Sequence, residues 1–401
     1  MNLNASFVLA KELKNPGVEH VDHLLFSNNA KFLLTAGDSD KVFVWNTETF
    51  RTEQVLENKG WGQVTCLAWA YADSPGGEAI TVLCVGSVAG SLTMFIMDSR
   101  SVKPFKERGT MTQIFTSNDT VENVAFDKIT GRLVASSHSG AVKMYHVEAT
   151  AGLVRLIWEA PSHRPGIPTS VIFYGDKNQN LLSFGLEDGV VHCQDAANGN
   201  ILWNKELASG IGSAALSSDQ KAVIVNNLNN GNFDVYQPPD MSPLQSLAVG
   251  DSKTTHCYFI KQCKFIEGSK LSICGSHNNK VYIFDVANNY ILQTLTSSDK
   301  DTHMTQAVAV TEAESRKVFI AASSNGSIYL WEKRAVTLTT GHLNSESRPG
   351  TTLYGYLRTH SPLFFFVALV TYPTWSPHAF AIYTYIISKM TENGLIREEG
   401  A

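Results

Sequence analysis

One pattern recurs along the chain from residue 38 to residue 332. Each copy is a short turn of small or polar residues, followed by an alternating apolar run that in most copies ends in an aromatic side chain. The first copy runs from Asp38 to Asn46 and the last from Ser324 to Glu332. The seven copies end at Trp45, Phe95, Tyr145, Gln194, Tyr236, Phe284 and Trp331. A spacing of about 48 residues indicates a repeat architecture, and this limits the possible folds more than any other feature of the sequence.

One position of the turn is almost restricted to glycine. The residues there are Asp40, Gly90, Gly140, Gly189, Gly231, Asn279 and Gly326. A tight hairpin turn often requires a positive φ, which Gly, Asn and Asp tolerate best. The alternation after the turn has the period of a β-strand, and a unit of about 48 residues has room for four short strands. We therefore expect an all-β fold for residues 1–334, a seven-bladed β-propeller of four-stranded antiparallel blades.

These copies resemble the repeats of the WD-repeat family, over roughly residues 1–334. The clearest copy holds His20-Val21, then Leu24–Ser27, Phe32–Gly37 and the Trp45-Asn46 ending. The family commonly buries a polar network of His, Ser or Thr, a turn Asp and Trp. Here the turn Asp position holds Ser39, Ala89, Ser139, Asp188, Asn230, Asn278 and Asn325. We therefore expect packing to stabilise the blades more than that network does.

Two segments are candidates for the strand that closes the ring. In the family an N-terminal run commonly joins the last blade as its outer strand, and Phe7–Leu13, within residues 1–15, has that place here. Ala335–Thr340 is the alternative, and the sequence does not decide between them.

Composition narrows the function. The net charge is −5 and Lys and Arg form no run, so we expect no nucleic-acid partner. The six cysteines form no CxxC pair and lie in apolar runs, which favours reduced, buried thiols over a zinc site. The N-terminus lacks a basic start followed by a long apolar run, so we expect a cytoplasmic or nuclear protein.

The C-terminal part departs from the repeat. We expect a linker at 335–361, an irregular or helical apolar segment at 362–388 and a short polar C-terminus at 389–401. Residues 359–388 contain no Asp, Glu, Lys or Arg, which is long enough for a membrane anchor, although Pro373 and Pro377 would kink a helix there. Membrane contact, packing on protein, and a splice or gene-model product all remain open for this segment.

Two motifs point to chemistry. Gly210–Ala215 matches the dinucleotide loop GxGxxA, but it leads into a turn and another strand, so we expect a connection between blades. Asp195–Trp203 looks like the blade motif of quinone-dependent propeller oxidoreductases, which that family repeats in every blade. With one copy here, we expect a hairpin turn at Asn198-Gly199 and Trp203 packed between blades. The sequence therefore predicts no enzyme and no cofactor or metal, with a quinone-type oxidoreductase as the alternative.

The resemblance also implies a binding rim. In the family, the residue before the turn Asp position faces one rim of the central channel, where proteins or peptides bind. In this sequence the rim residues are Asp38, Val88, His138, Glu187, Asn229, His277 and Ser324. Trp61, between two glycines, is either a binding anchor or a plug between blades. Arg164, in the loop before blade four, is a further candidate contact. We expect a non-catalytic scaffold that binds proteins or peptides on this rim.

Overall fold

The computed structural model describes residues 5–73, 79–98, 100–115, 119–148, 153–160, 166–249, 259–296, 304–311, 318–324 and 326–335. The chain divides into one unit from Met1 to Val336 and a second from Thr337 to Ala401. The second unit lies outside the described residues, and so do the apolar segment 362–388, the polar C-terminus and all but the first residue of the expected linker.

The first unit contains seven four-stranded sheets, each made of strands that follow one another in the chain except for the last. Blades one to three are β2 (Val21–Phe26), β3 (Phe32–Gly37), β4 (Lys41–Asn46) and β5 (Thr52–Glu57); β6 (Val64–Asp73), β7 (Ala79–Ser87), β8 (Leu92–Met97) and β9 (Phe105–Met111); β10 (Val121–Asp127), β11 (Arg132–Ser137), β12 (Val142–Glu148) and β13 (Leu153–Ala160). Blades four to six are β14 (Pro168–Tyr174), β15 (Asn180–Gly185), β16 (Val190–Asp195) and β17 (Ile201–Glu206); β18 (Ile211–Leu216), β19 (Val223–Asn227), β20 (Phe233–Gln237) and β21 (Ser242–Leu247); β22 (Cys263–Ile266), β23 (Leu271–Cys274), β24 (Lys280–Asp285) and β25 (Tyr290–Thr296). Blade seven is β26 (Val308–Val310), β27 (Phe319–Ser324), β28 (Ser327–Ala335) and β1 (Ala5–Lys14).

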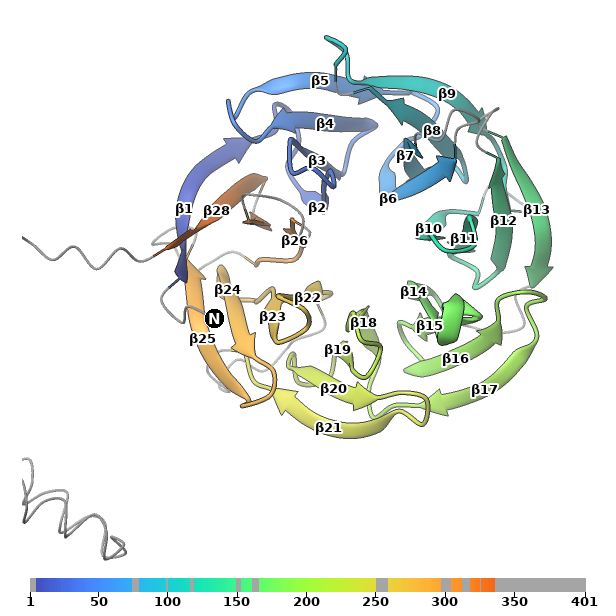
Figure 1. Cartoon of the computed structure of the whole chain (residues 1–401), viewed down its shortest axis with the longest axis vertical. Coiled ribbons are helices and arrows are strands. Elements are labelled where there is room, and N and C mark those ends of the chain that lie inside the picture. Colours follow the sequence, from blue (N-terminus) through green and yellow to red (C-terminus); the bar gives the residue numbers. More distant parts are fainter. Residues whose placement is uncertain are drawn as a thin grey trace, which may run out of the picture. The chain divides into compact units, whose positions relative to one another are not determined.

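The sheets stand in a ring, which confirms the expected seven-bladed propeller (Figure 1). All seven repeat endings lie in the third strand of a blade. The turn glycines have positive φ, from 64° at Gly189 to 88° at Gly140, and Asn279 has a φ of 58°. Asp40 is the exception, because it is not among the positive-φ residues. Within the described ranges, helical structure is limited to a 3-10 turn, η2 (Asp176–Asn178).

The N-terminal strand closes the ring. β1 pairs antiparallel with β28 along its length, from Ala5 opposite Ala335 to Lys14 opposite Ser327. Residue 335 thus belongs to the third strand of blade seven and not to a linker. Of the two candidates for the closing strand, Phe7–Leu13 fills that place, and residues 336–340 lie outside the described residues.

Apolar side chains fill the spaces between neighbouring blades. One cluster joins Leu34 and Val44 of blade one to Leu83 and Phe95 of blade two, and similar clusters lie at the other junctions. Complete burial of such a side chain contributes about 1.5–3 kcal/mol. Five cysteines, Cys66, Cys84, Cys193, Cys263 and Cys274, are buried free thiols in this core, as expected, and Cys257 lies outside the described residues.

A belt of hydrogen bonds links the innermost strands of blades two to five and continues to the connection that leads into blade six. Thr65 Oγ1 donates to the carbonyl of Val121 in the next blade, and Asn123 Nδ2 donates to Thr169 O at 3.2 Å. The pattern continues from Thr169 Oγ1 to Ile211 O at 3.1 Å. In blade five, Ser213 Oγ donates to Lys261 O at 2.8 Å. Each side chain satisfies a buried carbonyl of its neighbour, so the belt fixes the spacing of the inner strands.

Blade one retains part of a buried polar network. Trp45 Nε1 donates to Thr35 Oγ1 at 3.1 Å, and Thr35 Oγ1 donates to Asn15 Oδ1 at 3.0 Å. Asn15 is a neutral residue of the connection between β1 and β2, and no turn Asp takes part. The network therefore anchors this connection to the blade without a buried charge.

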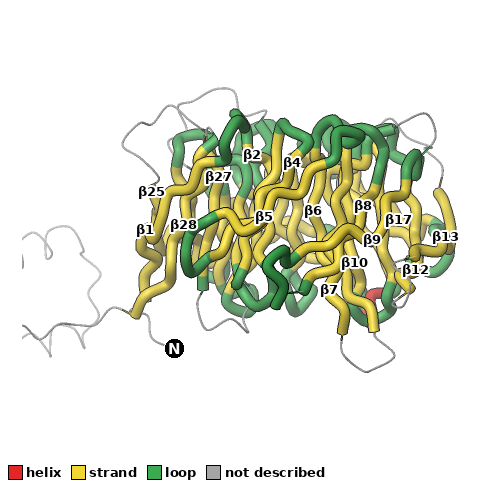
Figure 2. Tube along the Cα trace, turned by 90° about the horizontal axis from the view of Figure 1, so that it is seen from above, coloured by secondary structure: helices red, strands yellow, loops and turns green. Residues whose placement is uncertain are grey.

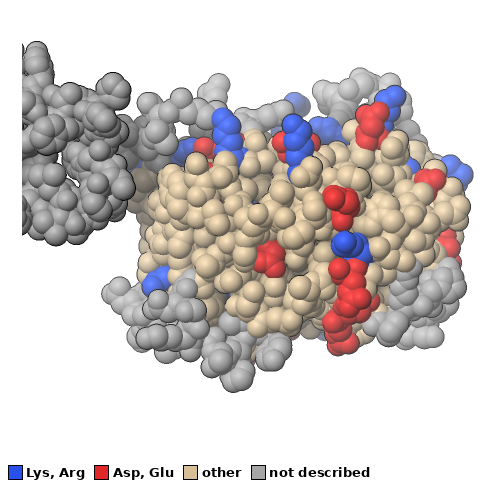
Figure 3. All heavy atoms as spheres, turned by 90° about the horizontal axis from the view of Figure 1, so that it is seen from below, with Lys and Arg blue, Asp and Glu red and all other residues tan. Residues whose placement is uncertain are grey.

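The outer wall of the ring differs in charge from blade to blade: β21 and β25 contain no charged residue, whereas β1, β5, β9, β13 and β17 each do. In the view of Figure 3, Lys, Arg, Asp and Glu side chains cover little of the wall. The outermost strands contribute exposed apolar side chains there, including Leu202 of β17, Leu244 of β21 and Tyr290, Ile291 and Leu292 of β25.

Candidate partner-binding face

The turns of the blades form two faces, which lie at the top and bottom of Figure 2. One face is formed by the turns between the second and third strands of each blade, together with the connections between blades. We call it the upper face. Backbone hydrogen bonds join these two kinds of segment in every blade. The donors are the amides of Asp38, Val88, His138, Leu186, Leu228, Gly275 and Ser323, and the acceptors are the carbonyls of His20, Gln63, Thr120, Ile167, Gly210, Gln262 and Ala307. The backbone of each turn is therefore held against a connection, which fixes the point of the face from which its side chains project.

The structure brings most of the expected rim residues to this upper face. Asp38, His138, Glu187 and Asn229 are exposed, and the side chain of Val88 is 42% exposed. His277 is half-buried, and the pKa of its imidazole is lowered by burial and, secondarily, by the nearby Lys261 ammonium. Ser324 ends β27, and its side chain is not among those described. Arg164 lies outside the described residues.

Trp61 does not belong to the exposed set. It is only 1% exposed, its Nε1 donates to Thr93 Oγ1 at 2.9 Å, and its ring packs edge-on against Phe95 with centroids 6.1 Å apart. The flanking Gly60 and Gly62 let the connection turn the indole inward between blades one and two. Of the two interpretations offered by the sequence, the plug between blades is correct and the binding anchor is wrong.

The polar groups of blade three are held by one another. His138 Nδ1 and Glu122 Oε1 are 2.6 Å apart, and the carboxylate of Asp119 accepts hydrogen bonds from the amide and hydroxyl of Ser139. These contacts fix the His138 imidazole at the surface beside a carboxylate. Such a pair offers a partner both a donor and an acceptor in defined positions.

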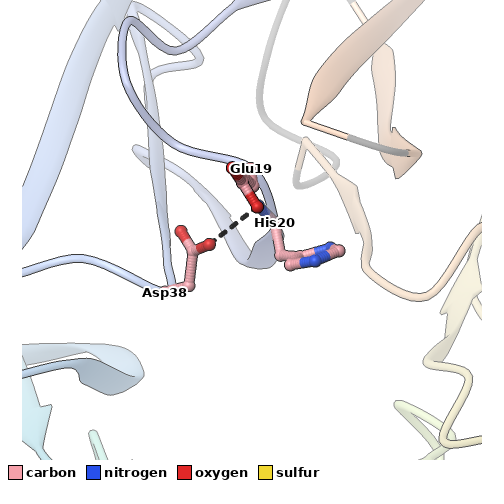
Figure 4. A group of neighbouring side chains, drawn as sticks. All are labelled: Glu19, His20 and Asp38. Atoms are coloured by element: carbon pink, nitrogen blue, oxygen red, sulfur yellow. Dashed lines mark hydrogen bonds between the residues drawn. The ribbon is translucent and has the colours of Figure 1, made fainter.

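Blade one presents a cluster of titratable side chains that the sequence did not predict. The Glu19 and Asp38 carboxylates and the His20 imidazole bring their polar atoms within 4.8 Å of one another, and all three side chains are exposed (Figure 4). The backbone amide of His20 donates to Asp38 Oδ2 at 3.3 Å. Just inside, burial raises the pKa of Asp22, His20 lowers it and Asp38 raises it further. The rim position that the resemblance implies is one residue per blade. It therefore identified Asp38 but not Glu19 and His20, which lie in the connection before β2.

A hollow of about 420 Å³ adjoins this group. It is lined by the connection from Lys14 to His20 and by Gly326 and Ser327 of blade seven. Gly326 has a φ of +73°, and a Cβ built there would lie 2.8 Å from Glu19 O. Glycine therefore lets the turn of blade seven approach this connection closely and forms one side of the hollow.

The two motifs examined for chemistry are parts of blades. Gly210–Ala215 enters β18, the innermost strand of blade five, so the inter-blade connection ends at Gly210 and no helix follows. Asp195–Trp203 is the hairpin between β16 and β17, where Gly199 has a φ of 76°. Trp203 packs against the cluster shared by blades four and five, as expected.

No helix among the described residues combines the length and apolar character needed to cross a bilayer. Comparison with protein-family models and with curated proteins finds no match to this chain.

Proposed function

We propose that this propeller is a non-catalytic protein-interaction scaffold of the WD-repeat type, which binds proteins or peptides on its upper face in the cytoplasm or nucleus. The observation that carries the proposal is the ring of exposed side chains at Asp38, Val88, His138, Glu187 and Asn229. Each stands on a turn that is hydrogen-bonded to the neighbouring connection. Polar groups held in place by a rigid framework lose little entropy on binding, which favours recognition of a partner.

The test separates this face from the opposite one. We would change His138, Glu187 and Asn229 to alanine together, and compare affinity purification with that of the wild type. The control changes Glu48, Gln179 and Asn288, which are equally exposed on lower-face turns and match the first set in charge. Truncation of an anchor residue typically costs about 2 kcal/mol or more, so partners should be depleted from the first variant only. If all co-purifying proteins bind both variants equally, this face is not the binding surface.

We further propose that residues 359–388 tether the propeller to a membrane. A stretch without a formal charge exposes apolar surface to water at a cost of roughly 25 cal/mol per Å², and lipid removes that cost. The full chain and a chain that ends at Ala335 would be fractionated after a carbonate wash. The full chain should stay with the membranes and the shorter chain should not. Recovery of both in the supernatant would exclude the tether.

A further inference from the structure

Among the described residues of the upper face, acidic side chains strongly outnumber basic ones. The described turns, connections and adjoining inner-strand ends of this face carry the carboxylates of Glu19, Asp22, Asp38, Asp40, Asp119, Glu122, Glu187 and Asp188. The exposed lysines of the same segments are Lys14 and Lys59, while Lys261 is fully buried. The lower face instead mixes both signs, with Lys31, Arg51, Lys103, Lys128, Lys177, Lys221 and Lys270 beside Glu48, Asp98, Asp176, Asp219, Asp240 and Glu267. The net charge of the whole chain does not reveal this polarity.

The acids of blade one have His20 beside them but no lysine or arginine partner among the described residues. In the described part of the chain, no Lys or Arg forms an ion pair with Glu19, Asp22, Asp38 or Asp40. Lys14 lines the hollow, and its Nζ lies 3.6 Å from Glu12 Oε1, so it is already paired with another carboxylate. By contrast, Asp119 and Glu122 of blade three are engaged by Ser139 and His138. Blade one therefore concentrates the negative potential that remains available to a ligand.

The shape of this region fits an extended chain. The hollow of about 420 Å³ begins at Glu19 and His20 and continues to Gly326 and Ser327, so it crosses the junction of blades one and seven. Figure 4 shows the Glu19 and Asp38 carboxylates on a short stretch of the rim, and the His20 imidazole belongs to the same group. A basic side chain contacting these carboxylates would leave room for its neighbours in the hollow.

We infer that the upper face, centred on Glu19, Asp38 and the adjoining hollow, binds an extended segment of a partner protein that is rich in Lys and Arg. The inference rests on the proposed function and specifies the chemistry of the partner. Complementary charge steers such a segment to the face and selects against acidic partners. Because the carboxylates are exposed, the attraction weakens as salt screens it.

The experiment uses the full chain and a fluorescein-labelled octalysine peptide, with binding followed by fluorescence anisotropy at low and high salt. The variant Glu19→Gln with Asp38→Asn removes two charges from blade one. The control, Glu48→Gln with Asp240→Asn, removes two from exposed positions of the lower face. The first should weaken binding about tenfold or more at low salt, and the control by less than about twofold. Octaglutamate should not bind.

Three outcomes would overturn the inference: no octalysine binding by the wild type, equal weakening in both variants, or displacement of the peptide by micromolar Zn²⁺ together with tight Zn²⁺ binding by the wild type. The second would indicate general attraction, and the third a metal site at Glu19, His20 and Asp38. The scaffold is tested separately, because its variants alter blades three to five. Suppose that partners are lost from the alanine variant of His138, Glu187 and Asn229 but are retained by Glu19→Gln with Asp38→Asn. The scaffold proposal would then stand, and the proposal of a basic segment at blade one would fail.

Discussion

The side-chain amide of Gln293 forms two hydrogen bonds with the backbone of Phe7. Gln293 Nε2 donates to Phe7 O at 2.8 Å, and the Phe7 amide donates to Gln293 Oε1 at 3.0 Å. Gln293 lies in the outer strand of blade six and Phe7 in the outer strand of blade seven. The closing strand is therefore fixed by its own sheet and also by the neighbouring blade.

Removal of residues 1–14 should destabilise the entire ring. The deletion leaves the ladder of β28 without its partner from Ser327 to Ala335 and exposes a new sheet edge. We expect a lower thermal midpoint and more aggregation on heating, measured by circular dichroism and light scattering. A midpoint equal to that of the full chain would show that β1 contributes nothing to closure.

Trp61 should matter for stability and not for binding. Trp61→Ala removes a fully buried ring and should cost about 3–5 kcal/mol of unfolding free energy. Trp61→Phe keeps most of the packing and loses the hydrogen bond to Thr93, at about 1–2 kcal/mol. Urea unfolding measures both. A variant with wild-type stability and lost partner binding would show that Trp61 acts in binding and not in packing.

Asp127 should clamp blade three to blade four. Its buried carboxylate accepts from Asn178 Nδ2 at 2.7 Å and lies 3.7 Å from Arg132, which itself donates to Asn178 O. Asp127→Ala leaves the largely buried Arg132 guanidinium without its carboxylate partner and should cost about 3 kcal/mol. The exposed Asp176, in the turn that also holds Asn178, provides the control, since Asp176→Ala should change the urea midpoint little. Equal effects of the two changes on the urea midpoint would show that Asp127 does not stabilise the junction of blades three and four.

His23 should make stability depend on pH. Burial lowers the pKa of its imidazole to about 4, from an ordinary value of 6.5. The unfolded chain therefore binds the proton first, and the contribution of neutral His23 is complete above pH 6.5 and is lost as the pH falls towards 4. Thermal midpoints of the wild type and His23→Gln between pH 7 and 4 test this. The variant should lose less stability over that interval, and parallel curves would contradict the prediction.

The outer strand of blade six should favour association between molecules. β25 has no charged residue and no proline, and it exposes Ile291 and Leu292. An edge strand without such protection pairs readily with other chains. Leu292→Lys should slow aggregation measured by light scattering. Val102→Lys is the control, because Val102 is 90% exposed in a turn and offers no strand edge. Equal slowing by both changes would point to net charge and not to the edge.

The sequence predicts the blades well because strand alternation and turn chemistry are local. Gly90 and Gly140 mark turns whose φ is positive, as expected, and Gln194 occupies a buried third-strand position although it is not aromatic. The direction of Trp61 is not local information, since flanking glycines allow the indole to turn either way. The same holds for the closing strand, because the pairing of Ala5 with Ala335 joins residues remote in the sequence.

The rim was only partly predictable for the same reason. A rule that names one position per blade finds Asp38, whose backbone is fixed by its own turn. The group formed with Glu19 and His20 depends on how the connection from blade seven lies against that turn. Such proximity follows from ring closure, which no single repeat encodes.

The pairing of β1 with β28 also sets the order of events during synthesis. At roughly 5–20 residues per second, tens of seconds separate the appearance of β1 from that of its partner strand. Throughout that interval a ten-residue strand with the apolar side chains of Val8 and Leu9 waits outside the ribosome without its ladder. Each of blades one to six takes its four strands from one continuous stretch of chain, whereas the sheet of blade seven is complete only when β1, made before all of those blades, pairs with β28.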